Sequence, residues 1–196
     1  MKNFDTGTFY SGDCLEVMST LADSSVDMIL CDLPYGTTAC AWDTVIPFDL
    51  LWEQYWRVLK PNRAIVLTAS QPFTTSLAAS QLQHLKYEWI WRKNRATGHV
   101  HAKNKPMKQH ENVLVFSKGT TVHEGQSQSR MPYYPQGVTK KYKTTSRRND
   151  TKYSDSVFSY CPGHPEVVFS DTEGYPASVL NFESVMDTIH PTQKPV

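Results

Sequence analysis

The chain has 196 residues, of which 39% are hydrophobic, and a formal net charge of +1. This length predicts one globular domain with a core of its own. No run of about 18 apolar residues occurs, and the first residues lack the apolar core of a signal peptide, so we expect a soluble cytoplasmic protein. The four cysteines form no Cys-x-x-Cys pair, which argues against a structural zinc site and against a disulfide framework.

The positive charge is concentrated in one region of the chain. Residues 92–152 contain 14 Lys and Arg against three Asp and Glu, so this region carries +11 and the remainder of the chain carries −10. Such a segregation favours a region that binds a polyanion, nucleic acid above all, over a set of merely solvated charges.

The first predicted elements lead to the most informative segment of the chain. A short strand is predicted over 8–13 and a short helix after it, which Asp13 is placed to cap. Residues 26–31 form an apolar run that predicts a buried strand, and the loop from Asp32 to Gly36 follows it. Ligands of open α/β sheets bind just outside the carboxyl ends of the strands, so we expect a site at this loop.

The loop after this strand carries groups that suit chemistry on a nucleobase. An exocyclic amino group is a poor nucleophile, because its lone pair is delocalised into the ring. The Asp32 carboxylate and the carbonyl of Leu33 or Pro34 would accept its hydrogens and stabilise the positive charge that develops when the nitrogen attacks a methyl donor. Tyr35 offers a flat face on which an extruded base stacks, and Pro34 fixes the backbone of the loop in advance.

Helical and strand patterns alternate along the rest of the first 118 residues. We predict helices over 47–60 and 70–83, and strands over 64–68, 87–91 and 112–116. Strands that alternate with helices predict an α/β fold with a doubly wound, mostly parallel sheet. Together with the two strands before them, they make five strands, fewer than a complete fold of this kind usually carries.

Separated segments of the chain resemble, in the same order, motifs of DNA amino-methyltransferases, which methylate adenine N6 or cytosine N4. The segment Asp32-Leu33-Pro34-Tyr35 resembles their Asp/Asn-Pro-Pro-Tyr/Phe motif, with Leu33 in place of the first proline. The other matching segments are Leu59-Lys60-Pro61-Asn62, Trp91-Arg92-Lys93-Asn94, His110-Glu111 with the strand that follows, and His190-Pro191-Thr192-Gln193-Lys194-Pro195. The resemblance thus covers much of the chain.

The resemblance implies a Rossmann-like methyltransferase fold, S-adenosylmethionine as cofactor, double-stranded DNA as partner, and a bacterial or phage-encoded enzyme of the restriction-modification type. It implies methylation of N6 of a flipped adenine, because the family's adenine enzymes usually begin the motif with Asp or Asn; cytosine N4 is the alternative. The catalytic residues would be Asp32, Pro34 and Tyr35, and the cofactor contacts Asp13, Asp32, Thr192 and Lys194. For Asp13, the helix cap remains the alternative role.

Two basic stretches contain candidate DNA contacts. Arg95 and His99 belong to the glycine-containing loop 95–101, which we expect to close over the extruded nucleotide, and Lys103 is a further candidate just after it. Residues 119–178 form a long, polar and basic insertion, which we interpret as a target-recognition region, with a mobile surface loop as the alternative. It separates a catalytic part, 1–118, from a return to the catalytic core, 179–196. Its candidate DNA contacts are Lys140, Lys141, Lys143, Arg147 and Arg148.

Two absences complete the predictions. No carboxylate or cysteine stands at ligand spacing from the histidines near residue 100, so we predict no metal site. Relatives with this motif order carry a Phe-x-Gly-x-Gly turn that approaches the cofactor closely, whereas no Gly-x-Gly occurs in the 196 residues. We therefore expect a fold that is incomplete at its C-terminal end. Three explanations stay open: a fragment of a longer enzyme, a site completed by a second chain or a homodimer partner, or an inactive relative that binds DNA.

Overall fold

The computed structural model of the chain describes residues 2–4, 7–122, 127–143 and 169–183. The chain forms two compact units, one made of residues 1–132 and 178–196 and the other of residues 133–177. The larger unit contains the main sheet and the two longest described helices. The smaller unit contains a two-stranded antiparallel ribbon of β7, Thr139–Lys143, and β8, Phe169–Glu173.

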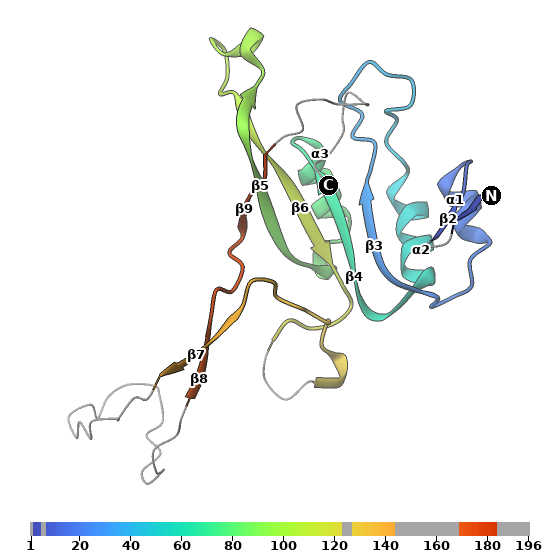
Figure 1. Cartoon of the computed structure of the whole chain (residues 1–196). Coiled ribbons are helices and arrows are strands. Elements are labelled where there is room, and N and C mark those ends of the chain that lie inside the picture. The colour runs from blue at the N-terminus through green and yellow to red at the C-terminus, as the bar shows by residue number, and fades with distance from the viewer. Residues whose placement is uncertain (1, 5–6, 123–126, 144–168, 184–196) are drawn as a thin grey trace. The chain divides into compact units, whose positions relative to one another are not determined.

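The main sheet has five strands in the order β3-β4-β6-β5-β9 (Figure 1). β3 pairs in parallel with β4, and β9 with β5, whereas β6 runs antiparallel to both of its neighbours, β4 and β5. Four of the five strands therefore run in one direction. Their bounds are Val26–Asp32 for β3, Leu59–Ala69 for β4, Leu85–Thr97 for β5, Lys108–Phe116 for β6 and Val179–Asn181 for β9.

The reversed strand β6 is the exception in a sheet that is otherwise mostly parallel, as the alternation of elements predicted. β6 follows β5 through a hairpin and not through a crossover helix, and strands joined by a hairpin are antiparallel. Both strands extend beyond the predicted ranges 87–91 and 112–116, because each supplies hydrogen-bond partners to the backbone of the other. For the same reason Arg95, which was predicted in a loop, lies in β5.

Two helices, α2 (Phe48–Val58) and α3 (Phe73–Ser80), pack against the sheet and share one core with it. The buried residues of α2 recur at spacings of three and four, so they line one face of the helix. Each fully buried Leu or Phe side chain stabilises the fold by about 1.5–3 kcal/mol. The core includes Leu51, Trp52, Tyr55, Ile65, Leu67, Leu77, Leu114 and Phe116.

The boundary between α2 and β4 differs from the sequence prediction. The helix ends at Val58 and β4 begins immediately at Leu59, so the residues between the predicted helix 47–60 and the predicted strand 64–68 lie inside the strand. The register with β3 shifts at this point, and Asn62 has a φ of +60°. These residues therefore interrupt the regular pairing of β4 with β3.

The remaining elements are short. β1 pairs with β2 in an antiparallel hairpin, and none of the described helices is long and apolar enough to cross a membrane. The bounds are Lys2–Phe4 for β1, Gly7–Phe9 for β2, Cys14–Ser19 for α1, Leu82–His84 for η1, His99–His101 for η2 and Ser127–Ser129 for η3.

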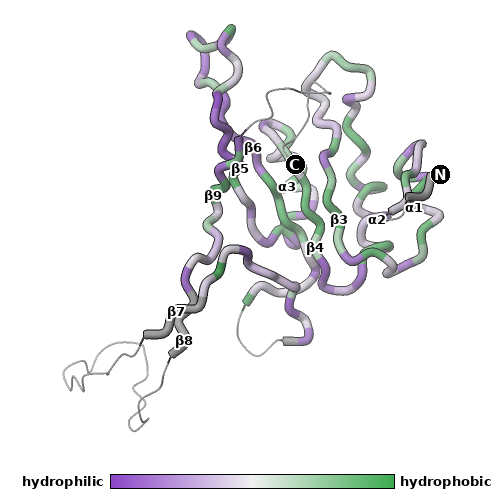
Figure 2. Tube along the Cα trace, in the orientation of Figure 1, coloured by the Kyte–Doolittle hydropathy of each residue, from purple (hydrophilic) through white to green (hydrophobic). Residues whose placement is uncertain are grey.

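The hairpin of β5 and β6 projects beyond one edge of the sheet. β3, β4 and β5 run in the same direction, so their carboxyl ends lie at this edge (Figure 1). The pairing of β4 with β6 stops at Ala69 opposite Asn112, whereas β5 and β6 remain paired as far as Thr97 opposite Lys108. We call residues 92–110 the hairpin arm. Figure 2 shows that much of this arm is hydrophilic, while the strands at the centre of the sheet are apolar.

Candidate functional site

The carboxyl end of β3 brings three polar side chains together. Asp32 is the last residue of β3, and Thr68 is its register partner on β4. The Thr68 hydroxyl donates a hydrogen bond to Oδ1 of Asp32. The Tyr35 hydroxyl oxygen lies 2.8 Å from the same carboxylate oxygen and 2.9 Å from the Thr68 hydroxyl oxygen. Two hydroxyl groups from separate segments therefore orient an exposed carboxylate.

The Tyr35 side chain is half-buried next to α3. Its ring stacks on Phe73, with 5.1 Å between the ring centroids and 23° between the planes. Burial raises the pKa of the Tyr35 hydroxyl well above its ordinary value; the Thr68 hydrogen bond opposes this rise, and the charges of Asp32 and Glu111 add to it. The hydroxyl is therefore protonated at neutral pH. Because Phe73 covers one ring face, a base that stacks on Tyr35 would use the opposite face.

Leu33, the residue that departs from the family motif, anchors this loop. Its side chain is 6% exposed and packs in the same core as Leu67 and Phe116. Leu33 is thus fixed in the core. The Asp32 carboxylate and the backbone around Pro34 flank it, so their positions are fixed as well.

A second carboxylate, Asp43, holds the backbone that follows Tyr35. Asp43 is 8% exposed, and its oxygens accept hydrogen bonds from the backbone N–H groups of Gly36, Thr37 and Thr38 at 2.8, 2.9 and 2.7 Å. Burial alone would raise its pKa, but the Thr38 hydroxyl and these N–H groups lower the pKa of Asp43 to about 2. The carboxylate is thus ionised at neutral pH and fixes the turn.

The sequence analysis missed Asp43, although a local signal for it exists. Asp43 is the one acidic residue between Asp32 and Asp49. Gly36 has a φ of +66°, and a Cβ added there would lie 2.9 Å from Val45 Cγ2, so the chain turns back sharply at a position that requires glycine. An Asp close to such a turn readily accepts its backbone N–H groups.

Two segments that carry the family resemblance meet across the hairpin. Lys93 forms an ion pair with Glu111, and Lys93 Nζ lies 4.7 Å from the centroid of the Trp91 ring. Glu111 and Trp91 are only 8% and 7% exposed and stand opposite each other in the register. The charge of Glu111 contributes to the raised pKa of the Tyr35 hydroxyl, so the ion pair lies within electrostatic reach of the Asp32 loop.

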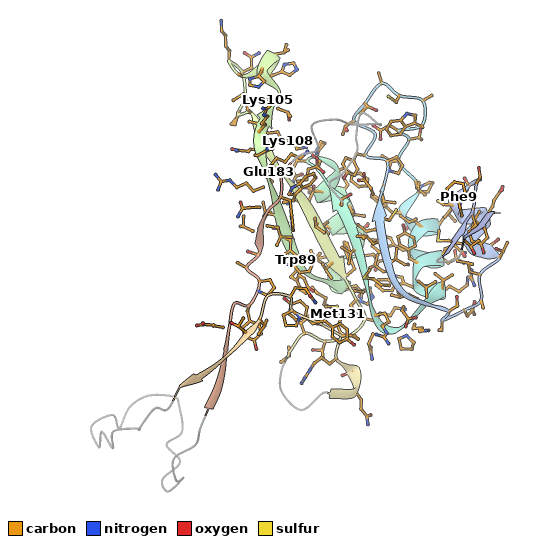
Figure 3. The ribbon with its side chains drawn as sticks, in the orientation of Figure 1. Phe9, Trp89, Lys105, Lys108, Met131 and Glu183 are labelled. Carbon is orange, nitrogen blue, oxygen red and sulfur yellow. The ribbon has the colours of Figure 1, made fainter. Side chains whose placement is uncertain are left out.

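The hairpin arm brings the first three predicted DNA contacts together. Arg95 in β5, His99 in η2 and Lys103 in the tip are all exposed. Lys105 and Lys108, which the sequence analysis left out, are exposed on the same arm (Figure 3). The arm contains six Lys and Arg and no Asp or Glu. Apart from Lys93, which is paired with Glu111, the cations of this projecting arm have no acidic residue on the arm itself.

Asp13 lies at the start of α1, where its carboxylate accepts hydrogen bonds from the N–H groups of Leu15 at 2.8 Å and Glu16 at 3.3 Å. This geometry confirms the helix-cap interpretation. The contact of Asp13 with a cofactor stays a prediction.

The other predicted contacts lie elsewhere in the chain. Three of them belong to β7 in the smaller unit: Lys140, Lys141 and Lys143. Four lie outside the described residues: Arg147, Arg148, Thr192 and Lys194. Within the described part of the chain, no three His, Cys, Asp or Glu side chains group so that they could hold a metal ion.

A comparison with protein families agrees with the motifs and the site. The model of the N6/N4 DNA methylase family matches residues 26–196, which is most of the chain. The chain therefore belongs to this family of DNA methylases, and the resemblance expected from its motifs is confirmed.

Three solved structures are similar to the chain. PvuII DNA methyltransferase, which is cytosine-N4-specific, has a TM-score of 0.50 and 11% identity over 91% of this chain and 58% of its own. M1.HpyAVI in complex with SAM has a TM-score of 0.41 and 18% identity over 62% and 63% of the two chains. TTHA0409 of Thermus thermophilus, complexed with S-adenosyl-L-methionine, has a TM-score of 0.41 and 20% identity over 60% and 56%.

The chain thus spans less than two-thirds of each of these structures. At 11% identity the likeness to PvuII DNA methyltransferase shows the fold alone. The predicted α/β methyltransferase fold is confirmed, with the mixed sheet described above.

We expect Asp43→Asn to loosen the turn after Tyr35. An amide nitrogen does not accept hydrogen bonds, so at least one of the three turn N–H groups loses its acceptor. Hydrogen exchange at residues 36–38 should become faster, on the order of tenfold. Asp49→Asn, at an exposed position of α2, is the matched control and should leave these rates unchanged. Equal rates in both variants would contradict the role of Asp43.

The same contact predicts a pH dependence. The pKa of Asp43 is about 2 in the folded chain and about 3.9 for an unperturbed Asp. The stabilisation is therefore fully present above the unperturbed value and is lost as the pH falls toward about 2. Protection of the turn amides in the wild-type chain should decline across this window. A decline of the same size in Asp43→Asn would show that another group is responsible.

The Lys93–Glu111 ion pair should stabilise the fold more than a surface pair does. Glu111→Gln or Lys93→Met alone deprives a largely buried charge of this counterion and should lower the free energy of unfolding by about 2–4 kcal/mol. The double variant should lose clearly less than the sum of the two single losses. Urea unfolding of the four proteins measures both quantities.

The exposed pair of Lys60 Nζ and Asp27 Oδ2, 2.7 Å apart, provides the control for this cycle. Lys60→Met and Asp27→Asn should change the unfolding free energy little, because surface ion pairs are screened by solvent. If breaking the Lys93–Glu111 pair has no larger effect than this control, the pair does not stabilise the hairpin.

Proposed function

We propose that the protein is a DNA methyltransferase that transfers a methyl group from S-adenosylmethionine to N6 of an adenine flipped out of double-stranded DNA. The observation that carries this proposal is the Asp32 carboxylate, exposed at the carboxyl end of β3 and oriented by the hydroxyls of Thr68 and Tyr35. It lies in a chain that belongs to a family of DNA methylases.

The proposed chemistry follows from the hydrogen-bond acceptors of the loop. The Asp32 carboxylate and the carbonyl before or at Pro34 accept the two hydrogens of the adenine amino group, which draws its lone pair out of conjugation with the ring. The nitrogen then forms a bond to the methyl carbon as the carbon–sulfur bond breaks, and the extra proton leaves through Asp32 to water. The positive charge that develops on nitrogen is stabilised by a carboxylate already in place.

The cofactor fits the charge of this loop. S-adenosylmethionine supplies a reactive methyl group on a positively charged sulfur, and the Asp32 carboxylate offers the opposite charge. We propose Asp13, Asp32, Thr192 and Lys194 as residues that hold it. A homodimer partner or a second chain that completes this pocket belongs to the same proposal.

The choice of base rests on the first residue of the motif. The family includes enzymes for adenine N6 and for cytosine N4, and Asp32 favours adenine. Tyr35 would stack on the base with the ring face that is turned away from Phe73. Nucleoside analysis of methylated DNA should yield N6-methyladenine. If it yields N4-methylcytosine, the target is cytosine N4 and not adenine N6.

DNA binding in this proposal is shared between two basic regions. Arg95, His99 and Lys103 of the hairpin arm would hold the phosphates near the target base. Residues 119–178 are proposed to recognise the target sequence, with Lys140, Lys141, Lys143, Arg147 and Arg148 as contacts.

A second candidate function is DNA binding without methyl transfer. The observation that favours it is the cationic hairpin arm, which carries exposed Lys and Arg side chains and no acidic residue. If the chain binds duplex DNA but transfers no labelled methyl group to it, this second function replaces the first.

We expect Asp32→Ala to lower methyl transfer by a factor of at least about 10², because it removes the acceptor that stabilises charge in the transition state. Binding of duplex DNA, measured by fluorescence anisotropy, should stay close to wild type. Asp27→Ala, on the same strand and exposed, is the matched control. A variant that lacks the Asp32 carboxylate and still methylates at the wild-type rate would refute the role given to Asp32.

A further inference from the structure

The tip of the hairpin arm presents an apolar side chain to solvent. Val100 is 91% exposed, more than any other large hydrophobic side chain in the described part of the chain. It is the central residue of η2, in the loop that joins β5 to β6. An isolated exposed valine is ordinary on a protein surface. What distinguishes Val100 is the cationic arm that carries it.

The backbone of the tip holds Val100 in place. Gly98 adopts a φ of +94°, which starts the turn. The N–H groups of His101 and Ala102 donate to the carbonyls of Gly98 and His99 at 2.9 and 3.1 Å, and Asn104 N–H donates to His101 at 2.8 Å. Val100 is therefore carried by a hydrogen-bonded turn on a paired two-stranded stem.

The charge below the tip restricts the partner. The arm contains six Lys and Arg and no acidic residue, and Lys103 is exposed on it. Lys105 and Lys108 are exposed there as well (Figure 3). A cationic stem with an apolar end fits a partner whose surface is anionic and whose interior is apolar. Duplex DNA has this construction, with phosphates outside and stacked bases inside.

The direction of the arm relates the tip to Asp32. β5 runs parallel to β3, so the arm leaves the sheet at the edge where Asp32 lies. Its pairing continues past the end of β4, which places the tip beyond that edge (Figure 1). DNA that presents a base to Asp32 would therefore meet the arm as well.

We propose that Val100 is a wedge that enters the DNA duplex and unstacks a base step while the basic residues of the arm hold the phosphates. The choice of DNA as partner rests on the proposed function. Apolar side chains that insert between base steps open the stack, and an opened stack lowers the free energy needed to extrude a neighbouring base. The wedge thus links DNA binding to presentation of the base.

The test compares two duplexes of about 25 base pairs, one fully paired and one with a single abasic site, in the absence of methyl donor. The wild-type chain should bind the abasic duplex about fivefold more tightly, because the gap receives the wedge without unstacking. Val100→Ala should lose most of this preference. Val122→Ala, also an exposed valine at 60%, is the matched control and should keep it. Circular dichroism should show the same fold for both variants.

Two results of this comparison would overturn the proposed role of Val100. One is a wild-type chain that binds both duplexes equally, and the other is a preference for the abasic duplex that persists in Val100→Ala. Binding to vesicles of anionic phospholipid in place of either duplex also overturns it and assigns the arm to a membrane surface.

Labelled methyl transfer, measured separately on the wild-type chain, distinguishes this inference from the proposed function. If the wild-type chain transfers methyl groups and Val100→Ala leaves the preference for the abasic duplex unchanged, only the wedge is refuted. A preference that depends on Val100 without methyl transfer refutes the catalytic proposal alone. Lys103→Gln should reduce the salt dependence of binding by about one counterion, whichever of the two holds.

Discussion

The two registers of β4 determine the geometry of the site. Parallel pairing with β3 places Thr68 beside Asp32. Antiparallel pairing with β6 ends at Asn112, and beyond this residue the β5–β6 hairpin extends past the end of β4. A shift of either register by one residue would turn the side chains of a strand to the opposite face. Ile65 and Leu67, both at 0% exposure on β4, oppose such a shift because it would expose them to water.

Around this strand, the polar groups of the site are oriented before any ligand arrives. Asp32 is held by two hydroxyls, and Asp43 holds three backbone N–H groups of the adjoining turn. The Tyr35 ring is fixed against Phe73, and burial keeps its hydroxyl protonated. Groups that are already in place need little reorganisation when charge develops on a substrate, which is why such an arrangement favours electrostatic catalysis.

Charge and apolar surface have different roles in the hairpin arm. The exposed cations of the arm act at a distance of about a Debye length and attract an anionic backbone regardless of its sequence. Val100 acts only on contact, and its proposed effect depends on the stacked bases inside the duplex. Because the hairpin that carries both belongs to the main sheet, the same sheet holds the site for a base and the surface for a duplex.

The sequence by itself determined the family, the strand that ends in Asp32, the α/β class and the charged region, because each of these depends on local order along the chain. It did not determine the reversed direction of β6, since alternating apolar residues look the same in parallel and antiparallel strands. Only the tertiary structure brought Thr68 to Asp32, and Lys93 to Glu111, because these contacts depend on which strands pair and in which register.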